Sequence, residues 1–158
     1  MKHLFAIAIV GITTSSFAET VLFSSFRLEL EDGWVYDLER VTQAHNEIGD
    51  LIRIYHPGGD GILKIRPISV PGSVSQETLR NMTNVDSSTA LNWQGWGDYS
   101  GYQHDYSEGG SFFRQWWIAN EETILLIVYD SSTEITAIEI DQINKIVNSI
   151  KAHTTLTN

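Results

Sequence analysis

The run from Thr123 to Tyr129 (TILLIVY) constrains the fold most, because almost every residue in it is apolar. Its length suits a strand, and its β-branched and aromatic residues favour extended structure. Successive residues of a strand point to opposite faces of a sheet, so both faces of this strand must be covered. We therefore expect a central strand with a further layer on each side.

Other short runs also predict strands, and the turns between them predict an antiparallel sheet. Residues 26–30 alternate apolar and polar side chains, which is the pattern of a half-buried strand. Residues 51–55 and 62–66 flank a glycine-rich turn, His56-Pro-Gly-Gly-Asp-Gly, of the kind that closes a hairpin. Further strands are predicted at residues 34–38, 98–106 and 112–119.

Two helices are expected. A short one is predicted at residues 75–82, with the serine at position 73 or 75 as its N-cap. A longer one is predicted from about residue 134 to residue 152, capped by Ser132 or Thr133. Its apolar residues recur on one helical face; they are Ile143, Ile146, Val147 and Ile150. These elements predict an α+β fold in which an antiparallel sheet is sandwiched between helices, with a long C-terminal helix.

The first eighteen residues have the order of regions typical of an export signal. Lys2 provides a positive start, residues 4–12 are apolar, and Ser16 and Ala18 are the small residues that signal peptidase requires. Cleavage is predicted after Ala18, which leaves residues 19–158 as a single domain. The alternatives are a buried N-terminal helix or a membrane anchor, but the apolar run is far shorter than the ~20 residues that span a bilayer. We expect a periplasmic or extracellular protein with no membrane insertion after cleavage.

Composition excludes several classes of function. The chain has no cysteine, so disulfides, thiolate chemistry and cysteine-held metals are excluded. It has 10 Lys and Arg against 20 Asp and Glu, which gives a formal charge of −10. An acidic surface of this kind repels nucleic acid and anionic lipid, and it favours a basic partner.

Three segments resemble a known class of proteins. They are Gly33-Trp34, YHPGGDGILKI at residues 55–65, and GDYSGYQHDYSEGGSFFRQWWIANEETILLIVYD at residues 97–130, which an amphipathic helix follows. Together with the exported N-terminus, they resemble the PsbP-like (Mog-type) class of small exported bacterial domains, over roughly residues 23–152. The resemblance implies an antiparallel sheet between helices, and a role in binding or assembly rather than catalysis.

The residue types that support catalysis or metal binding are scattered. The histidines that follow the predicted signal form no His-x-His or His-x-x-x-His pair; they are His45, His56, His104 and His153. His104 and Asp105 are adjacent in a predicted strand, so they point to opposite faces and cannot act as a base and its orienting carboxylate. The chain also lacks a Gly-x-Ser-x-Gly elbow, a phosphate loop and an Asp-x-Asp-x-Asp-Gly calcium loop. We expect no catalytic residues, no metal and no cofactor.

Aromatic residues between positions 93 and 106 are the strongest candidates for a functional surface. Trp93 and Trp96 lie in or beside a glycine-containing loop, where large rings are hard to bury. An exposed aromatic patch with an acidic rim is typical of a binding surface. The predicted binding patch consists of Trp93, Trp96, Tyr99, Tyr102 and Tyr106. The alternative is that Trp116, Trp117 and several of the tyrosines pack in the core beneath the helices.

These patterns favour an exported, non-catalytic domain that binds another protein of the cell envelope, as an assembly factor or a toxin-neutralising protein. The alternative is a domain that binds a small molecule or a glycan at the aromatic patch. An enzyme is the third hypothesis. It ranks last because a hydrolase would need a polar triad or paired carboxylates that converge in a cleft.

Overall fold

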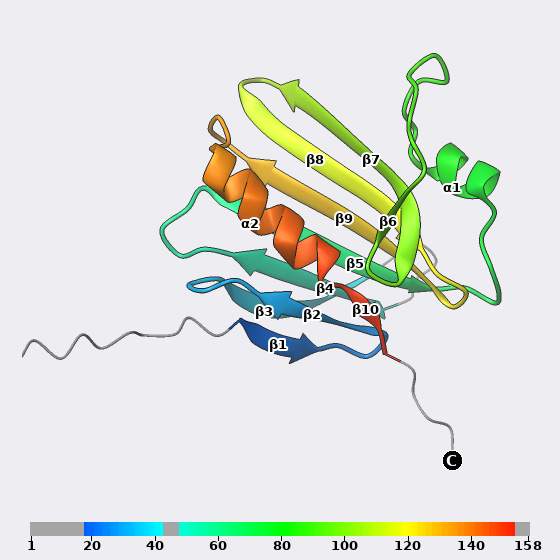
Figure 1. Ribbon diagram of the computed structural model, residues 1–158, viewed down its shortest axis with the longest axis horizontal. Helices are drawn as coiled ribbons and strands as arrows, with labels where there is room; N and C mark the ends of the chain where they lie inside the picture. Colours follow the sequence, from blue (N-terminus) through cyan, green and yellow to red (C-terminus); the bar gives the residue numbers. More distant parts are fainter. Residues whose placement is uncertain (1–17, 43–47, 154–158) are drawn as a thin grey trace, which may run out of the picture.

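The computed structural model describes residues 18–42 and 48–153 (Figure 1). In these residues the chain forms ten strands and two helices. In chain order they are β1 (Glu19–Leu22), β2 (Phe26–Leu30), β3 (Val35–Thr42), β4 (Ile48–Tyr55), β5 (Gly61–Ser69), α1 (Gln76–Met82), β6 (Gln94–Trp96), β7 (Tyr99–Glu108), β8 (Ser111–Ala119), β9 (Thr123–Ser131), α2 (Ala137–Asn148) and β10 (Lys151–Ala152).

The strands form two antiparallel sheets. The large sheet has seven strands in the order β3-β4-β5-β9-β8-β7-β6, and the small sheet has three in the order β1-β2-β10. Two meanders, β3-β4-β5 and β6-β7-β8-β9, are joined where β5 pairs with β9 over its whole length. The apolar run from Thr123 to Tyr129 is therefore the central strand of the large sheet, which confirms its predicted place.

One face of the large sheet, which we call the inner face, carries the main hydrophobic core. Ile54, Leu63, Trp116, Leu125 and Tyr129 lie on this face and are fully buried. The small sheet and α2 cover this face, as Figure 1 shows. The apolar stripe predicted for the last helix is buried in this core; it consists of Ile143, Ile146, Val147 and Ile150.

The opposite face, which we call the outer face, is covered only at one end in the described part of the chain (Figure 1). There α1 packs over the sheet through its buried Leu79. The side chains that form a second core with Leu79 are Tyr102, Trp117, Ala119 and Ile124. Farther along the same strands, side chains such as Phe113 and Val128 are partly exposed.

The prediction of a sheet sandwiched between helices is wrong, because the fold is mainly β. The two helices hold only 7 and 12 residues, and a second β-sheet takes much of the inner face. The predicted long C-terminal helix ends at Asn148, since Lys151 and Ala152 pair with β2 as a strand. Ile150 fits the helical spacing although it lies beyond the helix, which is why the periodicity overestimates the length of α2.

Local signals place most other elements correctly. Ser75 is the N-cap of α1, where its hydroxyl accepts a hydrogen bond from the Thr78 N–H. The N-cap of α2 is Thr136 rather than the predicted Ser132 or Thr133. The short strands β1, β6 and β10 were not predicted.

The predicted signal peptide falls almost wholly on residues 1–17, which lie outside the described residues. No described helix is long and apolar enough to cross a membrane.

Candidate binding surface

The hairpin of β7 and β8 carries the candidate site. Its turn consists of Gly109 and Gly110, whose φ angles of 58° and 85° are ones that side-chain-bearing residues rarely adopt. This two-residue turn sets the register, so that Tyr106 lies opposite Phe113 and Tyr102 lies opposite Trp117.

The structure divides the five predicted patch residues between two faces. Trp96 and Tyr99 point to the inner face and belong to the main core, and Tyr102 is buried on the outer face beside α1. Trp93 is 38% exposed and Tyr106 is partly exposed. The rings of the predicted patch are expected to be exposed. This expectation is wrong for Trp96, Tyr99 and Tyr102, which are buried, whereas Trp93 is exposed and Tyr106 is partly exposed.

Burial also changes the chemistry of Tyr99. Desolvation, with the nearby carboxylates of Asp98 and Glu122, raises the pKa of Tyr99 to about 12. Its hydroxyl donates a hydrogen bond to the Ser25 carbonyl oxygen at 3.5 Å, so it connects β7 to the small-sheet side of the core. Tyr99 is thus a structural residue rather than a contact for a ligand.

A group of rings remains accessible on the outer face. The His104 and Tyr106 rings stack with centroids 6.0 Å apart, and the Tyr106 and Phe113 rings stack at 4.8 Å. Trp93 packs edge-on against Tyr102, with centroids 5.2 Å apart. We call Trp93, His104, Tyr106 and Phe113 the outer aromatic surface.

Two members of this surface, His104 and Phe113, were not in the predicted patch. The strand period of two places His104 on the face of Tyr106. The two-residue glycine turn implies that Phe113 lies opposite Tyr106, so hairpin register was the signal that could have found it.

Polar groups surround the rings. Gln115 donates a hydrogen bond from Nε2 to the Tyr106 hydroxyl at 3.2 Å. Farther across the outer face, Lys64 Nζ lies 2.9 Å from Asp130 Oδ2. At the far edge, Arg53 binds Asp37 through Nε and Nη2 at 2.8 and 3.0 Å, and this carboxylate holds the pKa of Arg53 above its usual value. The outer face thus combines exposed rings with ion pairs.

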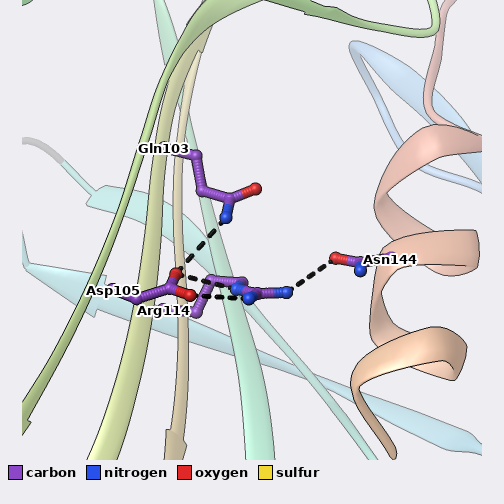
Figure 2. Close-up of polar contacts among 4 residues, drawn as sticks. All are labelled: Gln103, Asp105, Arg114 and Asn144. Carbon is purple, nitrogen blue, oxygen red and sulfur yellow. Dashed lines mark hydrogen bonds and ion pairs between the residues drawn. The ribbon is translucent and has the colours of Figure 1, made fainter. Parts of the chain in front are cut away.

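A polar cluster fixes the other side of the same hairpin, as Figure 2 shows. Arg114 Nε and Nη2 donate to the two Asp105 carboxylate oxygens at 2.8 and 2.6 Å. Arg114 Nη1 also donates to Asn144 Oδ1 of α2 at 3.0 Å, and Gln103 Nε2 donates to Asp105 at 3.3 Å. Because Arg114 is buried and its donors are engaged, the cluster joins the hairpin to α2 rather than offering a site for an anion.

The histidines that the structure describes do not converge. His56 Nδ1 accepts a hydrogen bond from the Gly58 N–H at 3.2 Å, in the turn between β4 and β5. His104 stacks on Tyr106, His153 lies after β10, and His45 lies outside the described residues. Within residues 18–42 and 48–153, no group of three or more His, Asp or Glu side chains is placed to hold a metal ion.

A polar cavity of about 520 Å³ lies away from the aromatic surface. Its lining includes Ser24, Ser25, Asn120, Glu121, Glu122 and His153. None of the outer aromatic residues lines it, so the exposed rings are part of an open sheet face rather than of this cavity.

Comparisons with known proteins bear on the fold alone. No family model matches the chain, and no curated protein matches it. A solved structure from Bacteroides thetaiotaomicron VPI-5482 is similar, with a TM-score of 0.54 and 11% sequence identity. The similarity covers 82% of this chain and 45% of that one, so this chain spans less than half of its neighbour's length. At this identity the likeness shows a shared fold, and membership of the PsbP-like class stays a prediction.

Proposed function

We propose that this protein is a non-catalytic binding domain that docks another protein on its outer aromatic surface. The observation that carries the proposal is the stack of His104, Tyr106 and Phe113, which is partly exposed on a sheet face that α1 covers only at one end. Aromatic rings at the centre of a patch, surrounded by polar groups, are common anchors of protein–protein interfaces.

The stack favours a protein over a glycan as the ligand. A sugar ring packs on the open face of an aromatic ring, but Tyr106 is already stacked with His104 and with Phe113. Trp93 is the most exposed ring of the surface and supports the second candidate, a glycan or a small molecule. A protein can instead use the exposed ring edges together with the polar groups around them.

We further propose that the domain acts in the periplasm or outside the cell, on a basic partner. The export-signal pattern of residues 1–18 supports a location outside the cytoplasm. The formal charge of −10 supports a partner with a positive net charge. A net charge of this size steers an oppositely charged protein toward the surface, so association should slow as salt is added.

The test is capture of a partner from an envelope extract, followed by measurement of its affinity for matched variants. Tyr106→Ala removes the central ring of the stack, so we expect Kd to rise by at least about 30-fold, the equivalent of ~2 kcal/mol for an interface anchor. Ile138→Ala is the matched control, because Ile138 is 74% exposed on α2, away from the outer face.

Equal affinity of wild type and Tyr106→Ala would contradict the proposed surface. Binding of a glycan that is lost in Trp93→Ala and kept in Tyr106→Ala would instead support the second candidate.

A further inference from the structure

Strand β7 is paired on one side along most of its length. On its other side, β6 pairs only with residues Tyr99 to Gly101. Strand β8 pairs with β7 from Ser100 to Glu108. Residues 102–108 therefore have a strand neighbour on one side only in the described part of the chain, which leaves a free edge of the large sheet.

The two turns that flank β7 identify the backbone groups on this free edge. In a two-residue hairpin the residues beside the turn form a hydrogen-bonded pair, and bonded residues alternate along the strand. Glu108 and Ser111 flank the glycine turn, so the even-numbered residues of β7 bond to β8. Trp96 and Tyr99 flank the turn before β7, so the odd-numbered residues face the side of β6. The residues whose N–H and C=O groups face the free edge are Gln103, Asp105 and Ser107.

The free edge lacks several of the features that block pairing with another chain. Natural edges carry lysines, prolines or bulges, whereas residues 102–108 (YQHDYSE) contain no lysine or proline and pair with β8 in unbroken register. Its only acidic side chains are those of Asp105 and Glu108. The Asp105 side chain remains 37% exposed beside Arg114, and Glu108 is exposed. The Asp105 charge is balanced by Arg114, so the exposed Glu108 and the formal charge of −10 are what favour positive charge on a strand that pairs with this edge.

We propose that the free edge of β7 binds an extended, basic segment of the partner by strand addition. This inference rests on the proposed function, and it specifies how the partner binds beside the outer aromatic surface. Alternate side chains of the added strand point to opposite faces of the sheet. Those on the outer face lie beside His104 and Tyr106, and those on the inner face lie beside the polar side chains of Gln103 and Asp105. The favoured ligand therefore alternates apolar residues with lysine or arginine.

Amide hydrogen exchange of the full chain, followed by NMR, tests strand addition at the free edge. The ligand is a short synthetic peptide in which lysine alternates with valine or tyrosine. With free peptide at about ten times its Kd, the amide protons of Gln103, Asp105 and Ser107 should exchange about tenfold more slowly. The amides of His104 and Tyr106 should be slow with or without peptide, because they bond to β8. The control peptide has the same side chains and N-methyl groups on alternate amides, and it should give no protection.

A pair of variants tests the same backbone groups. Ser107→Pro removes one N–H that faces the free edge and leaves the bonds to β8 in place, so the peptide Kd should rise about fivefold to tenfold. Ser107→Ala keeps this N–H and should leave the Kd unchanged.

Three outcomes would overturn the inference. If the peptide shifts the aromatic resonances of the outer face while the three amides still exchange fast, strand addition is wrong and the proposed surface stands. If the peptide does not bind, the ligand class is wrong, and capture of the partner still tests the proposed function by itself. If the three amides become protected without peptide as protein concentration rises, a second copy of the chain occupies the edge instead.

Discussion

Single residues in the β7–β8 hairpin have structural roles that depend on their burial. Arg114 is buried between the sheet and α2, and its charge is balanced by Asp105. A buried charge that loses its partner is costly, whereas exposed pairs contribute little. The stability of the hairpin should therefore be sensitive to this pair.

Asp105→Ala should lower the free energy of unfolding by about 2–4 kcal/mol, because it leaves the Arg114 guanidinium buried without its carboxylate. Urea denaturation measures the change. The control is Asp141→Ala, which breaks the exposed pair with Lys145 on α2 and should have no measurable effect. Equal losses in the two variants would contradict a special role for the buried pair.

Tyr99 predicts a specific dependence of stability on pH. Its pKa is raised from 10.0 to about 12 in the folded protein, so folding favours the neutral phenol. This contribution to stability is fully present below about pH 10 and is lost as pH rises through about 12. Denaturation of wild type and Tyr99→Phe at successive pH values should show a steeper fall for wild type above pH 10. Parallel curves would show that Tyr99 ionises as easily in the folded state as in the unfolded chain.

At the scale of elements, close contact between β7 and β8 determines whether the candidate surface forms. A Cβ atom at Gly101 would overlap the Trp117 carbonyl oxygen of β8, so no other residue fits without moving a strand. In β6, the nearest atom to a Cβ at Gly95 would be the Tyr99 carbonyl oxygen at 3.9 Å, which is an ordinary contact. The two glycines lie on neighbouring strands, but a side chain is excluded at Gly101 and has room at Gly95.

Gly101→Ala should therefore destabilise the protein by about 1–3 kcal/mol, as overpacking does, while Gly95→Ala should be tolerated. Thermal and urea denaturation measure both variants. If Gly101→Ala has the stability of wild type, then β7 and β8 are not packed as closely as the structure places them.

At the scale of the whole molecule, the two faces of the large sheet have different surroundings. The inner face is covered by α2 and by the small sheet, whose first strand begins at Glu19. The outer face is covered by α1 at one end and otherwise presents rings and ion pairs. In the part of the chain that the structure describes, this asymmetry leaves much of one face uncovered.

Export is a prediction about the whole chain. Mass spectrometry of the protein purified from the cells that make it should find Glu19 as the N-terminus, because Ser16 and Ala18 satisfy signal peptidase. An intact Met1 on protein recovered from the cytoplasm would contradict export.

Strand and turn positions were largely predictable, because they depend on neighbouring residues. The alternation in residues 26–30, the glycine turn after His56 and the Ser75 cap each act over a few positions, and the structure contains each of them. Helical spacing also predicted that Ile146 and Val147 are buried. The shared strand face of His104 and Tyr106 followed from the period of two in the same way.

Local conformation and side-chain polarity therefore account for the central strand, the hairpins and the buried side of the last helix, and these features could be predicted from the residues alone. Contacts between distant parts of the chain turn β10 back to pair with β2 and place a second sheet where a helical layer was expected. These contacts also determine which rings are exposed. Trp96 and Trp93 are similar in sequence context, but pairing of β6 with β7 points Trp96 into the core. Such outcomes depend on contacts between residues far apart in the chain, whose free energies no local pattern contains.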